Sequence, residues 1–425
     1  MVQIRKSVKL TGSFSRLERG FTMATWFLVI IYLSFISLGL PDSLLGSAWP
    51  VMRPELGASL GSAGLISMII AGGTIVSSLA SGAVVRRLGT GKVTLISCFL
   101  TAGALLGFSA APSLVWLAVL AIPLGLGGGS VDAALNHYVA QNYKAHHMNW
   151  LHCFWGVGAT AGPIIMSAFI AHNSSWRGGY QTVSILQFLL VIILFAALPL
   201  WKRVAEHHKL QNTQSIPSAE DHPAEEHPKT KVLDIRGVKP TLAAFLLYCG
   251  AESLVGLWGA SYLVGTRHIP AETAAGWISL YYGGITVGRL VTGFITLRIS
   301  NRVLIRCGQM AAIAGGITLL LPLPAVVSLI GLILIGLGLA PIYPGLIHET
   351  PARFGSENSA KLIGYQMAVA YTGTTFLPPI FGAVAAKTSI ALFPFVALAF
   401  LIIMLLSAEK VNLVLDKKAE IKTQA

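Results

Sequence analysis

The chain has 425 residues, of which 54% are hydrophobic and only 11% are charged. Ordinary soluble domains carry roughly 25% charged residues, so the composition excludes a chain built from such domains. The net charge of +13 would suit a nucleic-acid partner, but the basic residues are spread over short segments between long apolar runs. We therefore expect a membrane protein and no nucleic acid.

Apolar runs of about 20 residues recur along the chain, and each is long enough to cross a bilayer as a helix. Lipid offers no hydrogen-bond partner to the backbone, so helices are required. The predicted fold is an all-α membrane protein with twelve transmembrane helices. They are expected at 22–48, 58–82, 92–111, 114–140, 150–171, 179–201, 240–265, 273–296, 303–322, 324–347, 362–386 and 389–408.

Lys and Arg are distributed unevenly between the two sides of these spans. With the N-terminus placed inside, the inner segments hold 25 of the 30 basic residues. The outer loops hold Arg53, Arg177, Arg267 and Lys387, and Arg289 lies within a span. By the positive-inside rule, we expect a multi-pass protein of the cell (inner) membrane with both termini in the cytoplasm.

A polar, Pro-containing stretch at 203–238 interrupts the apolar pattern and predicts a cytoplasmic linker. The N-terminal six-helix bundle would occupy 1–202 and the C-terminal one 239–425. Four linker histidines allow a metal site in principle, but a solvated segment is the favoured interpretation, and we expect no metal. They are His207, His208, His222 and His227.

The two halves repeat each other in sequence. "GGTIVSSLASG" (72–82) aligns with "GGITVGRLVTG" (283–293), and "LGLGGGSVDAALNH" (124–137) aligns with "IGLGLAPIYPGLIH" (335–348), both at an offset of 211 residues. "PDSLLG" aligns with "AESLVG" at an offset of 210. Such parallel repeats predict two pseudo-symmetric six-helix bundles with a binding site at their interface.

Three carboxylates lie well inside the predicted spans: Asp42, Asp132 and Glu252. A charge at the centre of a membrane helix costs about 2.5–3.5 kcal/mol on insertion scales, so such residues usually face a cavity or a partner. We predict that Asp42 carries a proton, whereas Glu252 pairs with Arg289 in its own half. The alternative for each acid is a structural hydrogen bond between helices.

Asp132 and Asn136 are spaced i,i+4 and therefore share one helix face. The following span returns antiparallel, which brings His152 to roughly the depth of Asn136. Carboxylate, amide and imidazole together suit several solute hydroxyls, so these three residues are candidates for solute binding. A packed, hydrogen-bonded histidine is the competing interpretation for His152.

Aromatic side chains complete the candidate site, because an aromatic face covers the apolar face of a sugar. The candidates are Trp155, Trp258, Tyr281 and Tyr282. Other tryptophans are assigned to interfacial belts or packing; they are Trp26, Trp49, Trp176 and Trp201.

The two-bundle architecture resembles the major facilitator superfamily. "GAVVRRLGTGK" (82–92) is similar to the loop that this family carries between its second and third spans, with Arg86 at the usual acidic position. The resemblance implies a cytoplasmic gate to which Glu349 contributes an acid. The implied gate residues are Gly82, Arg87, Gly89, Lys92, Arg298 and Glu349.

A narrower resemblance is carried by "LPDSLLG", "SVDAALNHYV" and "NWLHCFWGVGATAGP". These segments look like the fucose/glucose–proton symporter branch of that family. The resemblance implies that Asp42 handles protons. It implies in addition that Asp132, Asn136 and His152 contact sugar.

We therefore expect a secondary transporter that carries a sugar or similar small polar solute with protons, as a functional monomer in the lipid bilayer. No Walker A loop, HExxH motif or nucleophile elbow is present, so neither an enzyme nor a cofactor is expected. Two alternatives remain open: a proton-driven exporter of drugs or sugars, and a transporter-like sensor or scaffold.

Overall fold

The computed structural model describes residues 27–143, 145–173, 175–213, 232–296 and 298–424. The first span, Phe27–Glu55, is helical up to a turn at Ser43 and continues as α2 (Leu44–Glu55). The remaining elements of the N-terminal half are α3 (Ser62–Leu88), α4 (Thr90–Ser109), α5 (Leu114–Asn142), α6 (Ala145–Asn173) and α7 (Trp176–Thr213). Those of the C-terminal half are η1 (Val232–Asp234), α8 (Val238–Arg267), α9 (Ala271–Ile295), α10 (Asn301–Leu320), α11 (Ala325–Leu339), α12 (Ile342–Phe354), α13 (Ser356–Lys387), η2 (Ile390–Leu392) and α14 (Phe393–Gln424).

Within the described residues, eleven helical stretches are long and apolar enough to cross a membrane. The remaining predicted span, at 273–296, corresponds to α9, which is of similar length but has a lower hydropathy because it carries Tyr281, Tyr282 and Arg289. α11 and α12 form one span, interrupted at Pro341, whose nitrogen cannot donate a helical hydrogen bond. The predicted all-helical membrane fold is confirmed.

α7 continues to Thr213, beyond the predicted start of the linker at 203. Residues 202–213 contain neither Pro nor Gly, so the membrane helix propagates into this polar stretch without a break. The side chains of His207 and His208 lie in this part and are not described. His222 and His227 lie outside the described residues.

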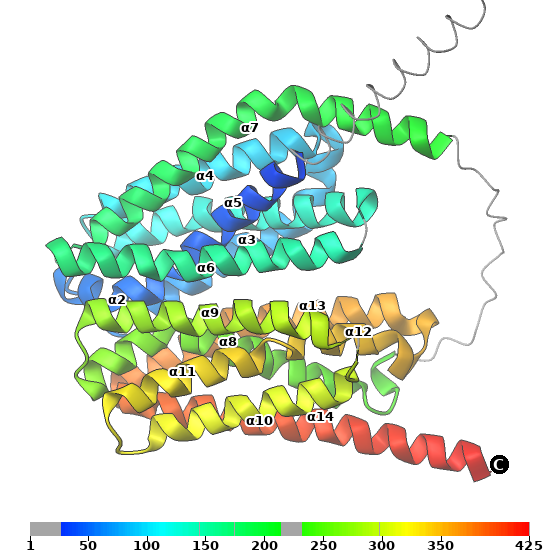
Figure 1. Ribbon diagram of the computed structural model, residues 1–425. Coiled ribbons are helices and arrows are strands. Elements are labelled where there is room, and N and C mark those ends of the chain that lie inside the picture. Colours follow the sequence, from blue (N-terminus) through cyan, green and yellow to red (C-terminus); the bar gives the residue numbers. More distant parts are fainter. Residues whose placement is uncertain (1–26, 144, 174, 214–231, 297, 425) are drawn as a thin grey trace, which may run out of the picture.

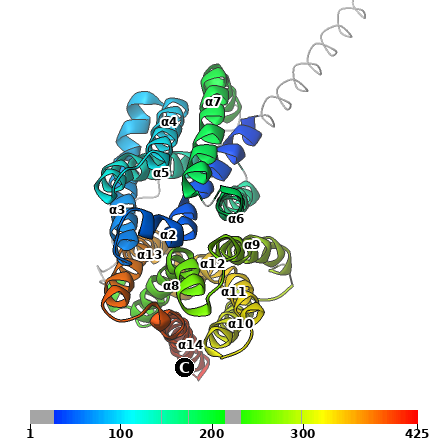
Figure 2. The same cartoon turned by 90° about the vertical axis from the view of Figure 1, so that its left-hand side faces the viewer.

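The helices before the linker form one group and those after it form a second group (Figures 1 and 2). Across the interface, α6 packs against α9, α3 against α13, and α2 against α8. Gly46 and Gly256, the last residues of the repeated segments "PDSLLG" and "AESLVG", allow α2 and α8 to approach. A Cβ on Gly46 would lie 2.1 Å from the carbonyl oxygen of Gly256. Small residues of this kind let membrane helices approach closely.

The halves meet closely at one end of the bundle. We call it the hairpin end, because it carries the short α2–α3 and α8–α9 connections, and we call the opposite end the linker end. At the hairpin end, a Cβ on Gly64 would lie 2.7 Å from the Cα of Pro379. Nearby, Ser167 Oγ donates to the carbonyl oxygen of Glu272 at 2.7 Å. The hairpin end is therefore the closed end of the interface.

Large apolar side chains are exposed on the outside of both halves. Leu79 is 82% exposed, Val115 72%, Phe195 68% and Phe294 67%. A soluble protein rarely exposes contiguous apolar surface on this scale. A lipid environment accounts for these exposed side chains.

Candidate functional site

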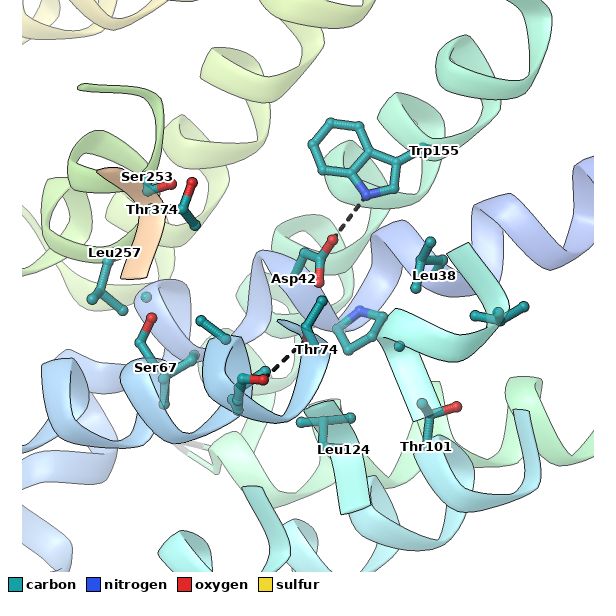
Figure 3. A pocket seen from close by; sticks show the side chains of 18 of the residues that line it. Leu38, Asp42, Ser67, Thr74, Thr101, Leu124, Trp155, Ser253, Leu257 and Thr374 are labelled. Atoms are coloured by element: carbon teal, nitrogen blue, oxygen red, sulfur yellow. Dashed lines mark hydrogen bonds between the residues drawn. The ribbon is translucent and has the colours of Figure 1, made fainter. Parts of the chain in front are cut away.

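A cavity of about 330 Å³ lies between the two halves (Figure 3), within the range typical of small-molecule sites. Its wall takes residues from the first span, α3, α4, α5, α6 and α7 on one side and from α8, α9 and α13 on the other. Its polar residues include Ser34, Ser37, Asp42, Ser67, Thr74, Thr101, Gln187, Glu252, Ser253, Tyr282, Tyr371, Thr374 and Thr375.

Asp42 lies directly before the turn at Ser43 that interrupts the first span. Its side chain is exposed within the cavity wall. Trp155 of α6 donates its indole N–H to Asp42 Oδ2 at 2.8 Å, and Figure 3 shows the two side chains pointing toward each other. The structure therefore joins two residues that the sequence assigned to different roles, proton coupling and solute contact.

Glu252 of α8 and Arg289 of α9 lie together, as the sequence predicts. Arg289 Nη2 is 3.5 Å from Glu252 Oε1, and both side chains are 16% exposed. The same nitrogen donates to the hydroxyl of Tyr248 at 3.3 Å. Charged N–H···O contacts are typically about 2.7–2.9 Å long, so this pair is loosely held.

The guanidinium of Arg289 also lies over the ring of Trp155, 5.5 Å from the ring centroid. This distance is within the reach of a cation–π contact. In the first half, the sequence position equivalent to Arg289 is Ser78, which donates to the carbonyl oxygen of Gly129 at 3.1 Å. Asp42 thus has no cation at that position, but a cation from the other half approaches it through Trp155.

Asp132 and Asn136 do share one face of α5. Asn136 Nδ2 donates to Asp132 Oδ1 at 2.9 Å, and both side chains are half-buried. His152 is exposed, and its ring edge faces Phe35 at a centroid distance of 6.0 Å. None of the three is among the residues that line the cavity. Asp132 lies one helical turn past Gly128, toward the linker end.

The predicted aromatic residues divide into two groups. Tyr282 lines the cavity, whereas Trp258 is fully buried and donates its indole N–H to the carbonyl oxygen of Pro378 at 2.8 Å. Tyr281 is also fully buried, and its hydroxyl donates to the backbone oxygen of Glu252 at 3.1 Å. In this conformation Trp258 and Tyr281 are packing residues, contrary to the expectation that they cover a solute, because helix packing encloses both rings.

The predicted gate residues lie at the linker end. Gly89 has φ +80°, a conformation that favours glycine and forms the turn between α3 and α4. Gly82 and Arg87 are exposed on α3, Lys92 is exposed on α4, and Arg298 is exposed between α9 and α10. Glu349 pairs with Arg353 at 3.2 Å within α12. This ion pair is therefore local to one helix rather than between the halves.

Gln187 is a cavity residue that sequence reasoning missed. It lies on α7, is 1% exposed, and donates through Nε2 to the carbonyl oxygen of Ser37 at 2.6 Å. Its Oε1 has no hydrogen-bond partner within the described residues. The available signal was a lone amide in the apolar run "SILQFLLVIILF" (184–195). The serines and threonines of the wall gave no such signal, because they are common in membrane helices.

Access to the cavity follows from the contacts between the halves. The hairpin end is closed by the approach of Gly64 to Pro379 and by the Ser167–Glu272 bond. Asp42 is nevertheless exposed. We infer that the cavity opens toward the linker end.

Comparisons with known proteins agree with this architecture. A model of the Major Facilitator Superfamily matches residues 31–357. One relative is "Bypass of stop codon protein 6" of Saccharomyces cerevisiae, 24% identical over 280 residues, which cover 62% of this chain and 56% of that protein. Another is the "Glucose/mannose transporter GlcP" of Bacillus subtilis, 24% identical over 233 residues, which cover 54% of this chain and 56% of that protein.

The matched region thus spans a little over half the length of these two relatives. Among solved structures, the xylose transporter XylE from E. coli in an inward-open conformation matches with a TM-score of 0.73 and 14% identity. The match covers 91% of this chain and 95% of that one. At this identity the likeness shows the fold alone.

Proposed function

The chain belongs to the major facilitator superfamily and is a transporter rather than an enzyme, and on that premise we propose that it carries a sugar or similar small polar solute together with protons. Transport occurs by alternating access, in which the two halves open the cavity first to one side and then to the other. The sugar-transporting relative supports the class of solute.

One observation carries the proposal of proton coupling. Asp42 exposes a carboxylate at the wall of the cavity, and its hydrogen bond comes from a neutral indole N–H rather than from a cation. A carboxylate at membrane depth is costly when ionised, so it suits a group that takes up and releases a proton. Asp42 is the proton carrier in this proposal.

The other groups have separate tasks. Asp132 and Asn136 bind solute hydroxyls with the support of His152, and Tyr282 and Trp155 cover the apolar face of the solute. Asp132, Asn136 and His152 lie toward the linker end, and the solute reaches them through the same opening that exposes Asp42. The pair of Glu252 and Arg289 changes its contacts as the halves move, and its 3.5 Å separation supports such a change.

The proposal includes the setting of the molecule. The halves at 1–202 and 239–425 act as two bundles, joined by a cytoplasmic linker at 203–238. The chain lies in the cell (inner) membrane with both termini and the linker end in the cytoplasm, in agreement with the positive-inside rule. Because one chain contains both sides of the cavity, it functions as a monomer. Glu349 and the basic residues of the two gate loops meet when the linker end closes.

Counterflow in proteoliposomes tests the proposal. Vesicles loaded with unlabelled hexose should exchange it for labelled hexose, and an inward proton gradient should drive accumulation that a protonophore abolishes. Hexose exchange without proton-driven accumulation would reject proton coupling. Drug exchange without hexose exchange would support the exporter, and no exchange of either solute would support a sensor or scaffold.

A further inference from the structure

Trp155 contacts both charged groups that the proposed function uses, one from each half. The edge of its ring donates to Asp42 Oδ2 at 2.8 Å, and the face of its ring lies 5.5 Å from the guanidinium carbon of Arg289. Asp42 and Trp155 belong to the N-terminal half, whereas Arg289 belongs to the C-terminal half. A single indole ring therefore connects the acid to the interface between the halves.

The backbone holds Trp155 in this position. A Cβ on Gly39 of the first span would lie 2.1 Å from the carbonyl oxygen of Trp155. The next residue, Gly156, approaches α9 so closely that a Cβ there would lie 2.4 Å from the hydroxyl of Thr286. α6 is thus packed tightly on a helix of each half at the level of this ring.

The surroundings of Asp42 limit which other charges act on it. Glu252 of α8 and Tyr282 of α9 line the same cavity as Asp42, and Asp132 of α5 lies one helical turn past the cavity residue Gly128. None of these is a cation. The guanidinium of Arg289 lies over the face of the Trp155 ring, whose N–H donates to Asp42.

We infer that Trp155 is the positioning residue that links the proton state of Asp42 to the contact between the two halves. This inference rests on the proposed proton coupling. The ionised carboxylate holds the indole N–H strongly, because hydrogen bonds to charged groups are stronger than neutral ones. The ring is then fixed with its face toward Arg289. A proton taken from cavity water neutralises Asp42 and weakens this bond, so the ring and Arg289 separate and Arg289 is left to Glu252 and Tyr248.

Trp155→Phe is the direct test, because phenylalanine keeps a ring face but has no N–H donor. The readout is proton-driven hexose accumulation divided by counterflow exchange, measured in the same proteoliposomes. Loss of a hydrogen bond to a charged group should lower this ratio about tenfold. A purely structural role would lower both quantities together and leave the ratio unchanged.

The chain offers a matched control in Trp176. This indole donates to Glu55 Oε2 at 2.5 Å and has Arg177 over its ring at 4.5 Å, but all three residues belong to the N-terminal half. Trp176→Phe removes the same kind of bond away from the cavity and should leave the ratio unchanged. In an Asp42→Asn background, Trp155→Phe should have no further effect on the ratio.

Several results would overturn the inference. An unchanged ratio in Trp155→Phe would do so, and a raised half-saturation concentration for hexose with that unchanged ratio would leave Trp155 with solute contact as its role and no part in coupling. If the phenylalanine variant does not fold, Trp155→Tyr, which keeps a ring face but displaces the donor, takes its place with the same expected loss. If the wild type exchanges hexose without proton-driven accumulation, the proposed coupling fails and the inference fails with it.

Discussion

Two tryptophans of this chain have the same kinds of neighbours in two different regions. Trp176 lies at the hairpin end, donates to the carboxylate of Glu55 and packs under Arg177. Arg177 also pairs directly with Glu55, with Nη2 at 2.7 Å from Oε1. The cation, the acid and the ring therefore support one another within one half. This cluster is a brace between the first span and α7.

The cluster around Trp155 differs in its connections. The acid that accepts from the indole is Asp42, but the acid nearest to Arg289 is Glu252, at 3.5 Å. The cation is thus shared between a ring of one half and a carboxylate of its own half. The two clusters contain the same groups: an acid, an indole and an arginine. Such a cluster braces a bundle when all its members belong to one half, and it can respond to movement of the halves when its members come from both.

The largest expected difference concerns removal of the cation. Arg289→Ala leaves Glu252 without its partner at a site where both side chains are 16% exposed, so we expect a loss of about 3 kcal/mol in stability. Arg177→Ala affects a pair whose side chains are 34% and 45% exposed, and the loss should be about 1 kcal/mol or less. Thermal unfolding in detergent measures both. The double variant Arg289→Ala/Glu252→Gln should lose less than Arg289→Ala, and simple additivity would mean that the two residues are not partners.

The second difference concerns the acids. Asp42→Asn mimics the protonated form, so the variant should still exchange labelled hexose but lose proton-driven accumulation at least about tenfold, a factor equivalent to roughly 1.4 kcal/mol. Glu55→Gln, the matched change in the Trp176 cluster, should leave accumulation within about twofold. Uptake and exchange in the same proteoliposomes provide the comparison. Accumulation by Asp42→Asn against a hexose gradient would remove Asp42 as the proton carrier.

The smallest expected difference concerns replacement of each arginine by lysine, and here the Trp176 cluster should lose more stability than the Trp155 cluster. Arg177 uses the shape of its guanidinium: Nε and Nη2 both donate to Glu55 Oε1, and Nη1 donates to the carbonyl oxygen of Ser109. Lysine cannot reproduce this fork, so Arg177→Lys should cost about 0.5–1 kcal/mol in stability. Arg289 contacts Glu252 and Tyr248 through the single nitrogen Nη2 and lies over the Trp155 ring. An ammonium group can also make these contacts, so Arg289→Lys should cost less than Arg177→Lys when melting temperatures are compared. Equal losses would mean that guanidinium shape matters equally in both clusters.

Sequence reasoning located the acids and the Glu252–Arg289 pair because a charge inside a membrane helix is rare and therefore visible. It did not find Gln187, because an uncharged amide in an apolar run is a weaker signal than a charge. It placed Trp258 and Tyr281 at the solute although both rings are fully buried. An aromatic residue gives no comparable signal, because it is equally compatible with a core, an interfacial belt or a cavity wall. Only packing distinguishes these environments.

The sequence by itself determined the helical spans, the repeat and the depth of each charge, because the bilayer requires long apolar helices and penalises charges near its centre whatever the fold. Only the tertiary structure decided which residues meet across the interface. Asp42 and Trp155 are 113 residues apart in the chain, and Arg289 comes from the other half. Their contact depends on how α6 packs between the first span and α9, where Gly39 and Gly156 permit close approach. That packing is a property of two surfaces together, and no local pattern in either segment encodes it.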